Sequence, residues 1–314
     1  MKAGRKKSKK NKYSRPVRAF FIRNGWKLLS YLPLRALQAL AVPLGWLIWR
    51  GSRRERRVTL TNLKLAFPDL SVAERKSLGK ASLIESTRTL LEMGFMWMAP
   101  KDRVLASVRS VQGAEELERL QQQQQPVILL GPHIGQWELI GQWFSARFPL
   151  TCMYSLPKVR ELDPVIRQGR CRTGGFLVPA DVKGVAGLLK ALRRGEAVGI
   201  LPDQVPDRGQ GGVFAPFYGH PVLTATLLPK LVQKTGARVF TALAKRLPRG
   251  EGYELILIPA DERVYSTDEQ EATAGVNASV EQIISYAPTQ YQWAYKRFKR
   301  VPKGTPKPYK SRRF

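Results

Sequence analysis

Apolar positions follow two patterns along this chain, helical spacing and short continuous runs. Ser71 and Glu74 form a capping-box pattern, and the apolar spacing after them predicts a helix that reaches about Met98. From residue 126 onwards, short apolar runs alternate with helical stretches. The predicted strands are 126–131, 150–155, 176–179 and 197–202, and the helices between them are 135–148 and the stretch with Val182, Val185, Leu188, Leu189 and Leu192 on one face.

Strands that alternate with helices indicate an α/β fold with a mostly parallel sheet flanked by helices. The next segment is rich in Gly and Pro, and a loop of that length inside a compact domain is typical of a functional segment. The remaining predicted elements are this loop at 202–221, a helix at 224–235, a hairpin of 238–247 with 253–259, a helix at 269–286 and a basic aromatic stretch at 290–299.

A membrane candidate lies near the N-terminus. Between Lys27 and Arg50 there are 22 residues with a single charge, Arg35. A spanning helix needs about 20 apolar residues, but Pro33, Pro43 and the charge weaken that interpretation. Both flanks are basic, which draws both ends toward the cytoplasm. We therefore predict a membrane-anchoring helix that does not span the bilayer, with an ordinary buried helix as the alternative.

The charge distribution divides the chain. Of the net +29, nine basic residues lie within the first 18 residues and nine more follow from Lys296, and no acidic residue occurs after Glu281. We expect a basic disordered tail (1–18), a membrane-anchor helix region (19–50), one folded domain (51–300) and a basic C-terminal tail (301–314). Two cysteines exclude a disulfide framework, and two histidines leave little material for a zinc site.

The most informative chemistry follows the first buried strand of the sheet. His133 stands in a turn bounded by Gly and Pro, and Glu138 lies in the second turn of the predicted helix after it. If His133 precedes the helix, Glu138 can reach back to one ring nitrogen and orient the imidazole. The other nitrogen can then take a proton from a hydroxyl. The alternative is a structural histidine paired with a local glutamate. His220 is interpreted as structural or solvent-facing, and Cys152 and Cys171 as buried thiols.

Ordered sequence blocks give this pattern a context. The chain resembles the bacterial lipid A biosynthesis acyltransferases, the late lauroyl and myristoyl transferases, from about Arg56 to Lys299. They belong with the glycerolipid acyltransferases that use a histidine–acid dyad. The resemblance rests on TNLKLAFP at 61–68, HIGQWE at 133–138, YSLP at 154–157, RQGRCR at 167–172, LPDQVP at 201–206, GGVFAPFYG at 211–219 and QYQWAYKRFK at 290–299.

The resemblance implies the fold and the reaction. The implied fold is a mostly parallel sheet like that of the glycerolipid acyltransferases. The implied reaction moves an acyl chain from the thioester of acyl carrier protein to a hydroxyl of a lipid A precursor, a Kdo-bearing acylated glucosamine disaccharide. His133 would be the general base and Glu138 its partner, a position that is often aspartate in relatives. No cofactor and no metal are expected, and the site would face the cytoplasmic side of the bacterial inner membrane.

Substrate binding is assigned to the remaining motif residues. Arg170 and Arg172 could bind lipid phosphates or Kdo carboxylates, and a solvated helix face is the alternative. The same resemblance points to Tyr154, Asp203 and Gln204, although structural support of the site is an equal interpretation for the last two. Relatives often carry arginine where this chain has Ser155, which leaves the role of that block open.

Several points stay open in the sequence. Backbone amides in 211–219 or at the start of the helix after His133 are candidates for stabilising the thioester oxyanion. Phe214, Phe217 and Tyr218 would line an acyl pocket or simply pack. The expected partners are acyl carrier protein, the lipid A precursor and an anionic membrane surface. An acyltransferase that uses acyl-CoA with another lipid is the main alternative. Nucleic-acid binding is disfavoured because the charge lies largely at the ends and no recognition motif occurs.

Overall fold

A mixed sheet forms the centre of the molecule. The computed structural model describes residues 16–207 and 209–310, and within them a seven-stranded sheet has the order β1-β9-β8-β2-β5-β3-β4. The five strands from β8 to β4 are parallel, whereas β9 pairs antiparallel with β8 and β1 runs with β9. The strands are β1 (Val108–Gln112), β2 (Val127–Leu130), β3 (Leu150–Tyr154), β4 (Phe176–Pro179), β5 (Ala197–Ile200), β8 (Arg238–Arg246) and β9 (Tyr253–Pro259).

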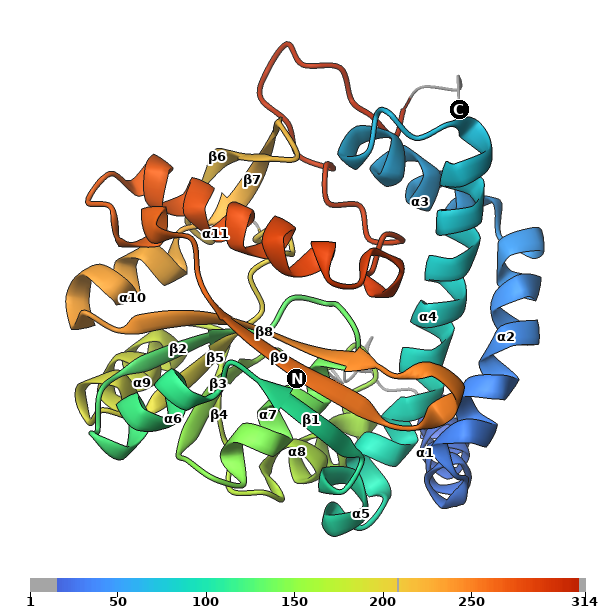
Figure 1. The fold of residues 1–314 in the computed structure, drawn as a ribbon, viewed down its shortest axis with the longest axis horizontal. Coiled ribbons are helices and arrows are strands. Elements are labelled where there is room, and N and C mark those ends of the chain that lie inside the picture. The colour runs from blue at the N-terminus through green and yellow to red at the C-terminus, as the bar shows by residue number, and fades with distance from the viewer. Residues whose placement is uncertain (1–15, 208, 311–314) are drawn as a thin grey trace, which may run out of the picture.

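Helices cover both faces of this sheet (Figure 1). One face packs against α6 and α7, and the other against α9, α10 and α11. The helices are α1 (Pro16–Tyr31), α2 (Leu34–Gly51), α3 (Arg53–Ala66), α4 (Val72–Met98), α5 (Lys101–Leu105), α6 (Glu115–Gln122), α7 (Trp137–Ser145), α8 (Asp163–Cys171), α9 (Val182–Arg193), α10 (Leu227–Thr235) and α11 (Glu269–Ser285), with 3₁₀ turns η1 (Arg160–Leu162), η2 (Pro248–Gly250), η3 (Glu262–Tyr265) and η4 (Pro288–Gln290).

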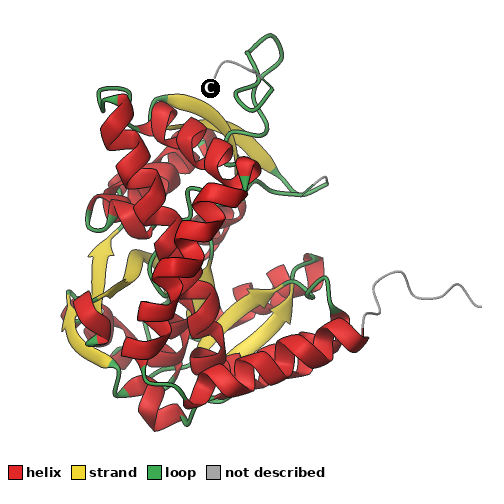
Figure 2. Cartoon of the chain, turned by 90° about the vertical axis from the view of Figure 1, so that its right-hand side faces the viewer, coloured by secondary structure: helices red, strands yellow, loops and turns green. Residues whose placement is uncertain are grey.

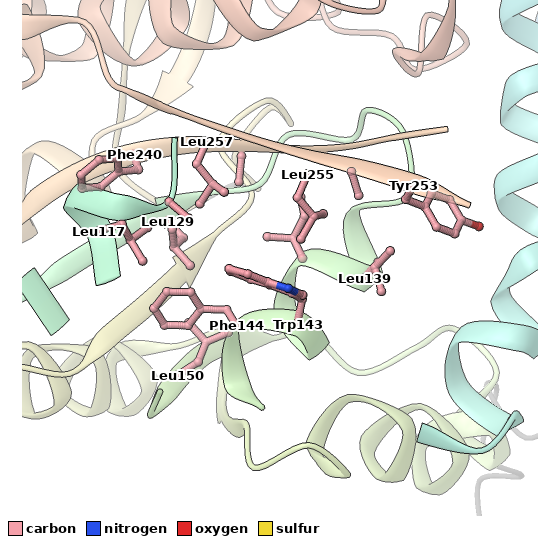
Figure 3. Packing of buried hydrophobic residues seen from close by; sticks show 14 of the residues in the cluster. Leu117, Leu129, Leu139, Trp143, Phe144, Leu150, Phe240, Tyr253, Leu255 and Leu257 are labelled. Carbon is pink, nitrogen blue, oxygen red and sulfur yellow. The ribbon is translucent and has the colours of Figure 1, made fainter. Parts of the chain in front are cut away.

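The position of strand β2 in the sheet explains why all of its residues are apolar. Val127 and Leu129 face the α6 and α7 side, whereas Ile128 and Leu130 face the α9 and α10 side. All four side chains are buried, as expected for a parallel strand that is covered on both faces. Figure 3 shows the first of these cores, where Trp143 and Phe144 of α7 lie beneath the strands.

The predicted elements of the folded domain agree well with the structure. Helix α4 begins with the capping box of Ser71 and Glu74, which is fully formed, and ends at Met98. The predicted strands correspond to β2, β3, β4 and β5, and the predicted hairpin is β8 with β9. One expectation was wrong. The segment 202–221 is not a single loop, because β6 (Gly212–Phe217) pairs antiparallel with β7 (His220–Ala225).

The apolar N-terminal segment folds as two helices instead of one. The α1 helix ends at Tyr31 and α2 starts after Pro33, whose backbone is extended; proline has no N–H to continue a helix. Figure 2 looks onto the side of the molecule that these helices cover. Among the described residues, no helix has the length and apolarity needed to cross a bilayer.

Helices α1 and α2 nevertheless expose many large apolar side chains. Leu37 and Ala41 of α2 are buried, and Ala19 of α1 is buried against residues of β3 and α8. The outer surfaces carry exposed apolar side chains, which we call the apolar face: Val17, Phe20, Phe21, Leu28 and Tyr31 of α1, and Leu40, Val42, Leu44, Trp46 and Leu47 of α2.

The two segments expected to be disordered tails differ in how far the structure describes them. Residues 1–15 and 311–314 lie outside the described residues, while Pro16 already belongs to α1. In the C-terminal segment, Tyr309 packs against the apolar cluster around α3. Its hydroxyl donates to Asn62 and accepts from the backbone N–H of Phe298. Residues as far as Tyr309 are therefore held against the folded domain.

A buried ion pair joins α4 to the end of β8. Arg246 donates to both carboxylate oxygens of Glu92 at 2.9 Å, and the Arg246 and Glu92 side chains are 1% and 0% exposed. Arg246 also donates to the backbone carbonyl of Gly135, while Gln136 donates to Glu92. A buried charge is tolerated only when it is paired and hydrogen-bonded. This pair fixes the turn that carries His133 against α4.

Candidate functional site

The site lies where β2 and β5 end side by side. The two strands pair in parallel, with Leu130 opposite Ile200, so the residues after each strand reach the same edge of the sheet. His133 follows β2 and Asp203 follows β5. Ligands of open α/β sheets bind at this carboxyl edge.

The turn after β2 needs a glycine. Gly135 has φ of 58°, and a Cβ atom there would lie 2.1 Å from the carbonyl oxygen of Ala244. Both neighbouring backbone groups are held, because the N–H of Gly135 donates to Gln290 and the N–H of Gln136 donates to Ala244. His133 is therefore presented from a rigid turn just before α7.

Both ring nitrogens of His133 contact the loop after β5. Its Nδ1 lies 2.8 Å from Oδ1 of Asp203, and its backbone N–H donates to Oδ2 of the same carboxylate at 3.0 Å. The side-chain amide nitrogen of Gln204 lies 3.1 Å from Nε2. Asp203 therefore forms hydrogen bonds with both the backbone and the ring of His133.

The carboxylate of Asp203 is ionised. Burial alone raises its pKa, but the charge of His133 and two hydrogen bonds from that residue, with further attraction from Arg297, hold the pKa below the ordinary value. An ionised carboxylate only accepts hydrogen bonds. Nδ1 of His133 therefore carries the proton, which leaves the lone pair on Nε2 free to take another one.

Glu138 lies close to this histidine but pairs elsewhere. Arg170 donates to both of its carboxylate oxygens, and the indole N–H of Trp97 donates to Oε2 at 2.9 Å. The expected hydrogen bond to His133 is not formed in this structure, where Asp203 and Gln204 hold the ring. The reason is geometric: α7 begins at Trp137, so Glu138 lies in its first turn and faces α8 and α4. Its catalytic role stays a prediction.

Glu138 also stays charged although it is buried. Burial alone raises its pKa, but Arg170, through its charge and hydrogen bonds, and the indole of Trp97 outweigh that and lower the pKa below the ordinary value. The charge of His133 lowers it further. The carboxylates of Asp203 and Glu138 are thus both negative. Asp203 binds the ring of His133, and Glu138 binds Arg170.

The other predicted site residues have contacts within the protein. Arg172 donates to Gln142 and to the backbone carbonyls of Met96 and Ala99. The Tyr154 ring is buried, with the guanidinium of Arg170 5.3 Å from its centroid. The substrate-binding roles predicted for Arg170, Arg172 and Tyr154 stay predictions.

Two cavities meet at Trp137. One is apolar and runs between α7 and the strands; its lining includes Leu129, Ile140, Leu150 and Leu177, with Glu138 and Arg170 on its wall. The other lies between α4 and the chain after α11. Its lining is mixed and comprises His133 and Trp137, the apolar residues Ile48, Leu83, Leu90 and Ala294, and the polar residues Glu55, Ser86, Thr87, Thr89, Gln290 and Gln292. Trp137 lines both cavities, so an apolar ligand in the first could meet, beside His133, a ligand in the second that has both apolar and polar groups.

Other candidates from the sequence lie outside these cavities. Phe217 and Tyr218 belong to an aromatic cluster with Phe67 and Trp293, which supports the packing interpretation. The His220 ring lies perpendicular to the ring of Phe298, with the centroids 5.9 Å apart. In the part of the chain that the structure describes, no group of three His, Cys, Asp or Glu residues could hold a metal ion.

Sequence reasoning named Asp203 but not its contact with His133. Both residues follow buried runs of a predicted parallel sheet, and the carboxyl ends of such strands share an edge. That β2 and β5 are neighbours is seen only in the structure, because β3 and β4 separate them in the chain. Trp97 and Arg246 were missed altogether. Neither stands in a recognisable motif, and their contacts come from chain positions more than 40 residues away.

Fold and site together define an α/β protein with a histidine–aspartate pair suited to take a proton from a hydroxyl. A family model described as bacterial lipid A biosynthesis acyltransferase matches residues 5–300. The chain therefore belongs to the bacterial lipid A biosynthesis acyltransferases and is an acyltransferase enzyme of lipid A biosynthesis.

Named relatives agree with this assignment. The chain is 31% identical over 284 residues to the lipid A biosynthesis lauroyltransferase of Escherichia coli K12, covering 90% of this chain and 91% of that one. It is 31% identical over 274 residues to the palmitoleoyltransferase of the same organism, covering 87% and 88%. To the myristoyltransferase it is 24% identical over 284 residues, covering 90% and 87%.

The Glu138–Arg170 pair predicts a pH-dependent stability. The pKa of Glu138 is lower in the folded protein than its ordinary value. Ionised Glu138 therefore contributes fully to the free energy of unfolding above the pKa of about 4.3 that it has in the unfolded chain. This contribution is lost as the pH falls through the pKa of Glu138 in the folded protein. Glu138→Gln should lower the free energy of unfolding at pH 7 by about 3 kcal/mol. The difference from wild type should shrink as the pH falls below about 4. Denaturant unfolding at a series of pH values measures it, and a difference that stays constant to acid pH would contradict the pairing.

Proposed function

We propose that this enzyme transfers an acyl chain from the thioester of acyl carrier protein to a hydroxyl of a Kdo-bearing, acylated glucosamine disaccharide. The family match and the names of the relatives support a lipid A precursor as acceptor. The observation that carries the mechanism is the position of His133. Asp203 holds it on the wall of the mixed cavity, beside Trp137, which also lines the apolar cavity.

His133 acts as the general base. Its Nε2 takes the proton of the acceptor hydroxyl while that oxygen attacks the thioester carbonyl carbon. The tetrahedral intermediate collapses, the thiolate of the carrier leaves, and His133 returns the proton to the sulfur. Asp203 stabilises the imidazolium and keeps the ring in position, the task that an acidic partner has in such pairs.

Glu138 has a different part in this proposal from the one that the sequence suggested. Its charge and that of His133 attract each other, which is one of the causes that lower the pKa of Glu138. Its hydrogen bonds go to Arg170 and Trp97, which bring α8 and α4 to the start of α7. We propose that Glu138 builds the wall of the donor cavity and adds to the negative potential at the base.

The two cavities suit the two substrates. The apolar cavity fits an acyl chain, since aliphatic side chains dominate its lining and four glycines, Gly131, Gly141, Gly175 and Gly199, leave room between them. The mixed cavity has hydroxyl and amide groups, Ser86, Thr87 and Gln292 among them, that can hydrogen bond to sugar hydroxyls, and apolar side chains, Leu83 and Leu90 among them, that can contact the acyl chains of the acceptor. We propose that Arg170 lies near the thioester, and that phosphate or carboxylate groups of the acceptor interact with basic residues around the cavity mouths.

The enzyme is proposed to work at the cytoplasmic face of the inner membrane. The apolar face of α1 and α2 includes Phe20 and Phe21 at 60% and 68% exposure. Trp46 lies at this face with the Arg50 guanidinium 4.6 Å from its ring centroid, a pair suited to the headgroup layer. A helix with such a face and basic neighbours binds in the plane of an anionic bilayer.

The acceptor and the base are tested together by mass spectrometry of lipid A. We expect that the wild-type protein, expressed in a strain that lacks its own late acyltransferase, adds one secondary acyl chain. His133→Ala should abolish this addition, because no other group in the proposal can take the hydroxyl proton. An unchanged lipid A pattern with wild type would reject the acceptor, and full activity of His133→Ala would reject the mechanism. Transfer from acyl-CoA to a phospholipid would favour the alternative acyltransferase.

The membrane proposal is tested by sedimentation with vesicles. Each phenylalanine side chain that leaves water contributes about 1.5–3 kcal/mol, so the double variant Phe20→Ser, Phe21→Ser should bind phosphatidylglycerol-containing vesicles at least about tenfold more weakly. Val182→Ser, at an apolar position of α9 that is 86% exposed, is the matched control and should bind like wild type. Equal binding by all three proteins would show that the apolar face does not contact the bilayer.

A further inference from the structure

We propose that Gln204 is a catalytic residue, whose side-chain amide occupies the place of the acceptor hydroxyl in the free enzyme and donates a hydrogen bond to the thioester carbonyl oxygen during attack. The inference rests on the proposed function. Its starting point is that consecutive residues of one loop contact the two nitrogens of one imidazole: Asp203 contacts Nδ1 and Gln204 contacts Nε2.

The direction of the Gln204 hydrogen bond follows from Asp203. Because the ionised Asp203 carboxylate accepts from Nδ1–H, Nε2 of His133 bears only a lone pair. The neighbour of that lone pair must be a donor, and the amide nitrogen of Gln204 lies 3.1 Å from it. An acceptor hydroxyl has to approach the same lone pair with its own hydrogen. The amide of Gln204 thus stands where the substrate hydroxyl must bind and is displaced when the acceptor arrives.

The loop is fixed while the Gln204 side chain is exposed. On one side of Gln204, Asp203 is buried and held by His133; on the other, the backbone N–H of Val205 donates to the hydroxyl of Tyr295 at 2.9 Å. Lys299 donates to the same hydroxyl. Gln204 itself is exposed. Only its side chain therefore has to rotate, so the amide can turn from Nε2 to a nearby oxygen without moving the loop.

The reaction creates such an oxygen close by. When the hydroxyl oxygen attacks, its proton goes to Nε2, and the π electrons of the carbonyl move onto the carbonyl oxygen. This oxyanion is bonded to the carbon under attack, so it lies within a few ångströms of Nε2. Donors placed about 2.7–3.1 Å from such an oxyanion accelerate acyl transfer. As the C–S bond breaks, the carbonyl re-forms, the sulfur leaves with the electron pair, and the proton on Nε2 passes to it.

The loop amides considered from sequence are less well placed for this task. Within 211–219, residues of β6 pair with β7 from Gly212 opposite Ala225 to Phe217 opposite His220. Phe217 and Tyr218 then face the aromatic cluster instead of the cavities. Gln204 is already in contact with the base.

Enzyme kinetics distinguish a catalytic from a binding role. With purified full-length enzyme, an acyl carrier thioester and a lipid A precursor, Gln204→Glu keeps the shape of the side chain but removes the donor. We expect kcat to fall by about 10²–10³-fold, with KM changed by less than about threefold. Gln204→Ala should lose a similar factor, and Gln204→Asn, which keeps an amide, should recover part of it. Gln210→Glu makes the same change later in the loop, where the side chain binds the backbone of Asp207, and should leave kcat unchanged.

A second measurement needs no substrate. The chain has only two histidines, so ¹⁵N-labelled histidine with a His220→Gln variant assigns the His133 ring by NMR. We expect a proton on Nδ1 and a hydrogen-bonded lone pair on Nε2 in wild type, with the Nε2 resonance moving toward that of a free lone pair in Gln204→Ala. A proton found on Nε2 in the wild-type enzyme would overturn the inference.

The outcomes separate this inference from the proposed function. Active wild type with Gln204→Glu and Gln204→Ala within about threefold of its kcat would overturn the catalytic role alone. A loss confined to KM would do the same, since it would make Gln204 a binding residue. A wild-type enzyme without any acyl transfer would overturn the proposed function and this inference together.

Discussion

The hydrogen bonds between His133 and Asp203 connect the fold to its chemistry. They join the ends of two adjacent parallel strands, so any change in the register of β2 and β5 would separate the base from its carboxylate. Each oxygen of the Asp203 carboxylate accepts one hydrogen bond from His133, one from the ring and one from the backbone. A pair fixed this way needs no reorganisation when the imidazole becomes charged, which is the condition for efficient electrostatic stabilisation.

Around this pair, buried charges attach the turn after β2 to the neighbouring helices. Arg246 and Glu92 clamp the Gly135 turn between β8 and α4, and Arg170 with Trp97 clamps Glu138 at the start of α7. Trp97 packs edge-on against Trp26 of α1, with ring centroids 5.0 Å apart. The helix that carries part of the apolar face is thus two contacts from the Glu138 carboxylate on the wall of the apolar cavity. The apolar face and the candidate site thus belong to one packed unit.

Local sequence signals predicted most of the fold. The capping box at Ser71, the buried run of β2 and the hairpin of β8 with β9 could be predicted because period, caps and turn residues act within a few positions. The partner of His133 could not, since Glu138 is near in sequence whereas Asp203 is near only after the sheet forms. The break at Pro33 was visible as a proline, but its effect on α1 and α2 depends on packing against α4.

The most direct test of this account compares the two carboxylates by single-turnover acyl transfer. Asp203→Asn keeps the size of the side chain but removes the charge that stabilises the imidazolium, and we expect the transfer rate to fall by about 10²–10⁴-fold. Glu138→Gln, measured at neutral pH under conditions where it stays folded, should lose clearly less. Near-normal transfer by Asp203→Asn, with the large loss in Glu138→Gln, would contradict the account and make Glu138 the partner of His133.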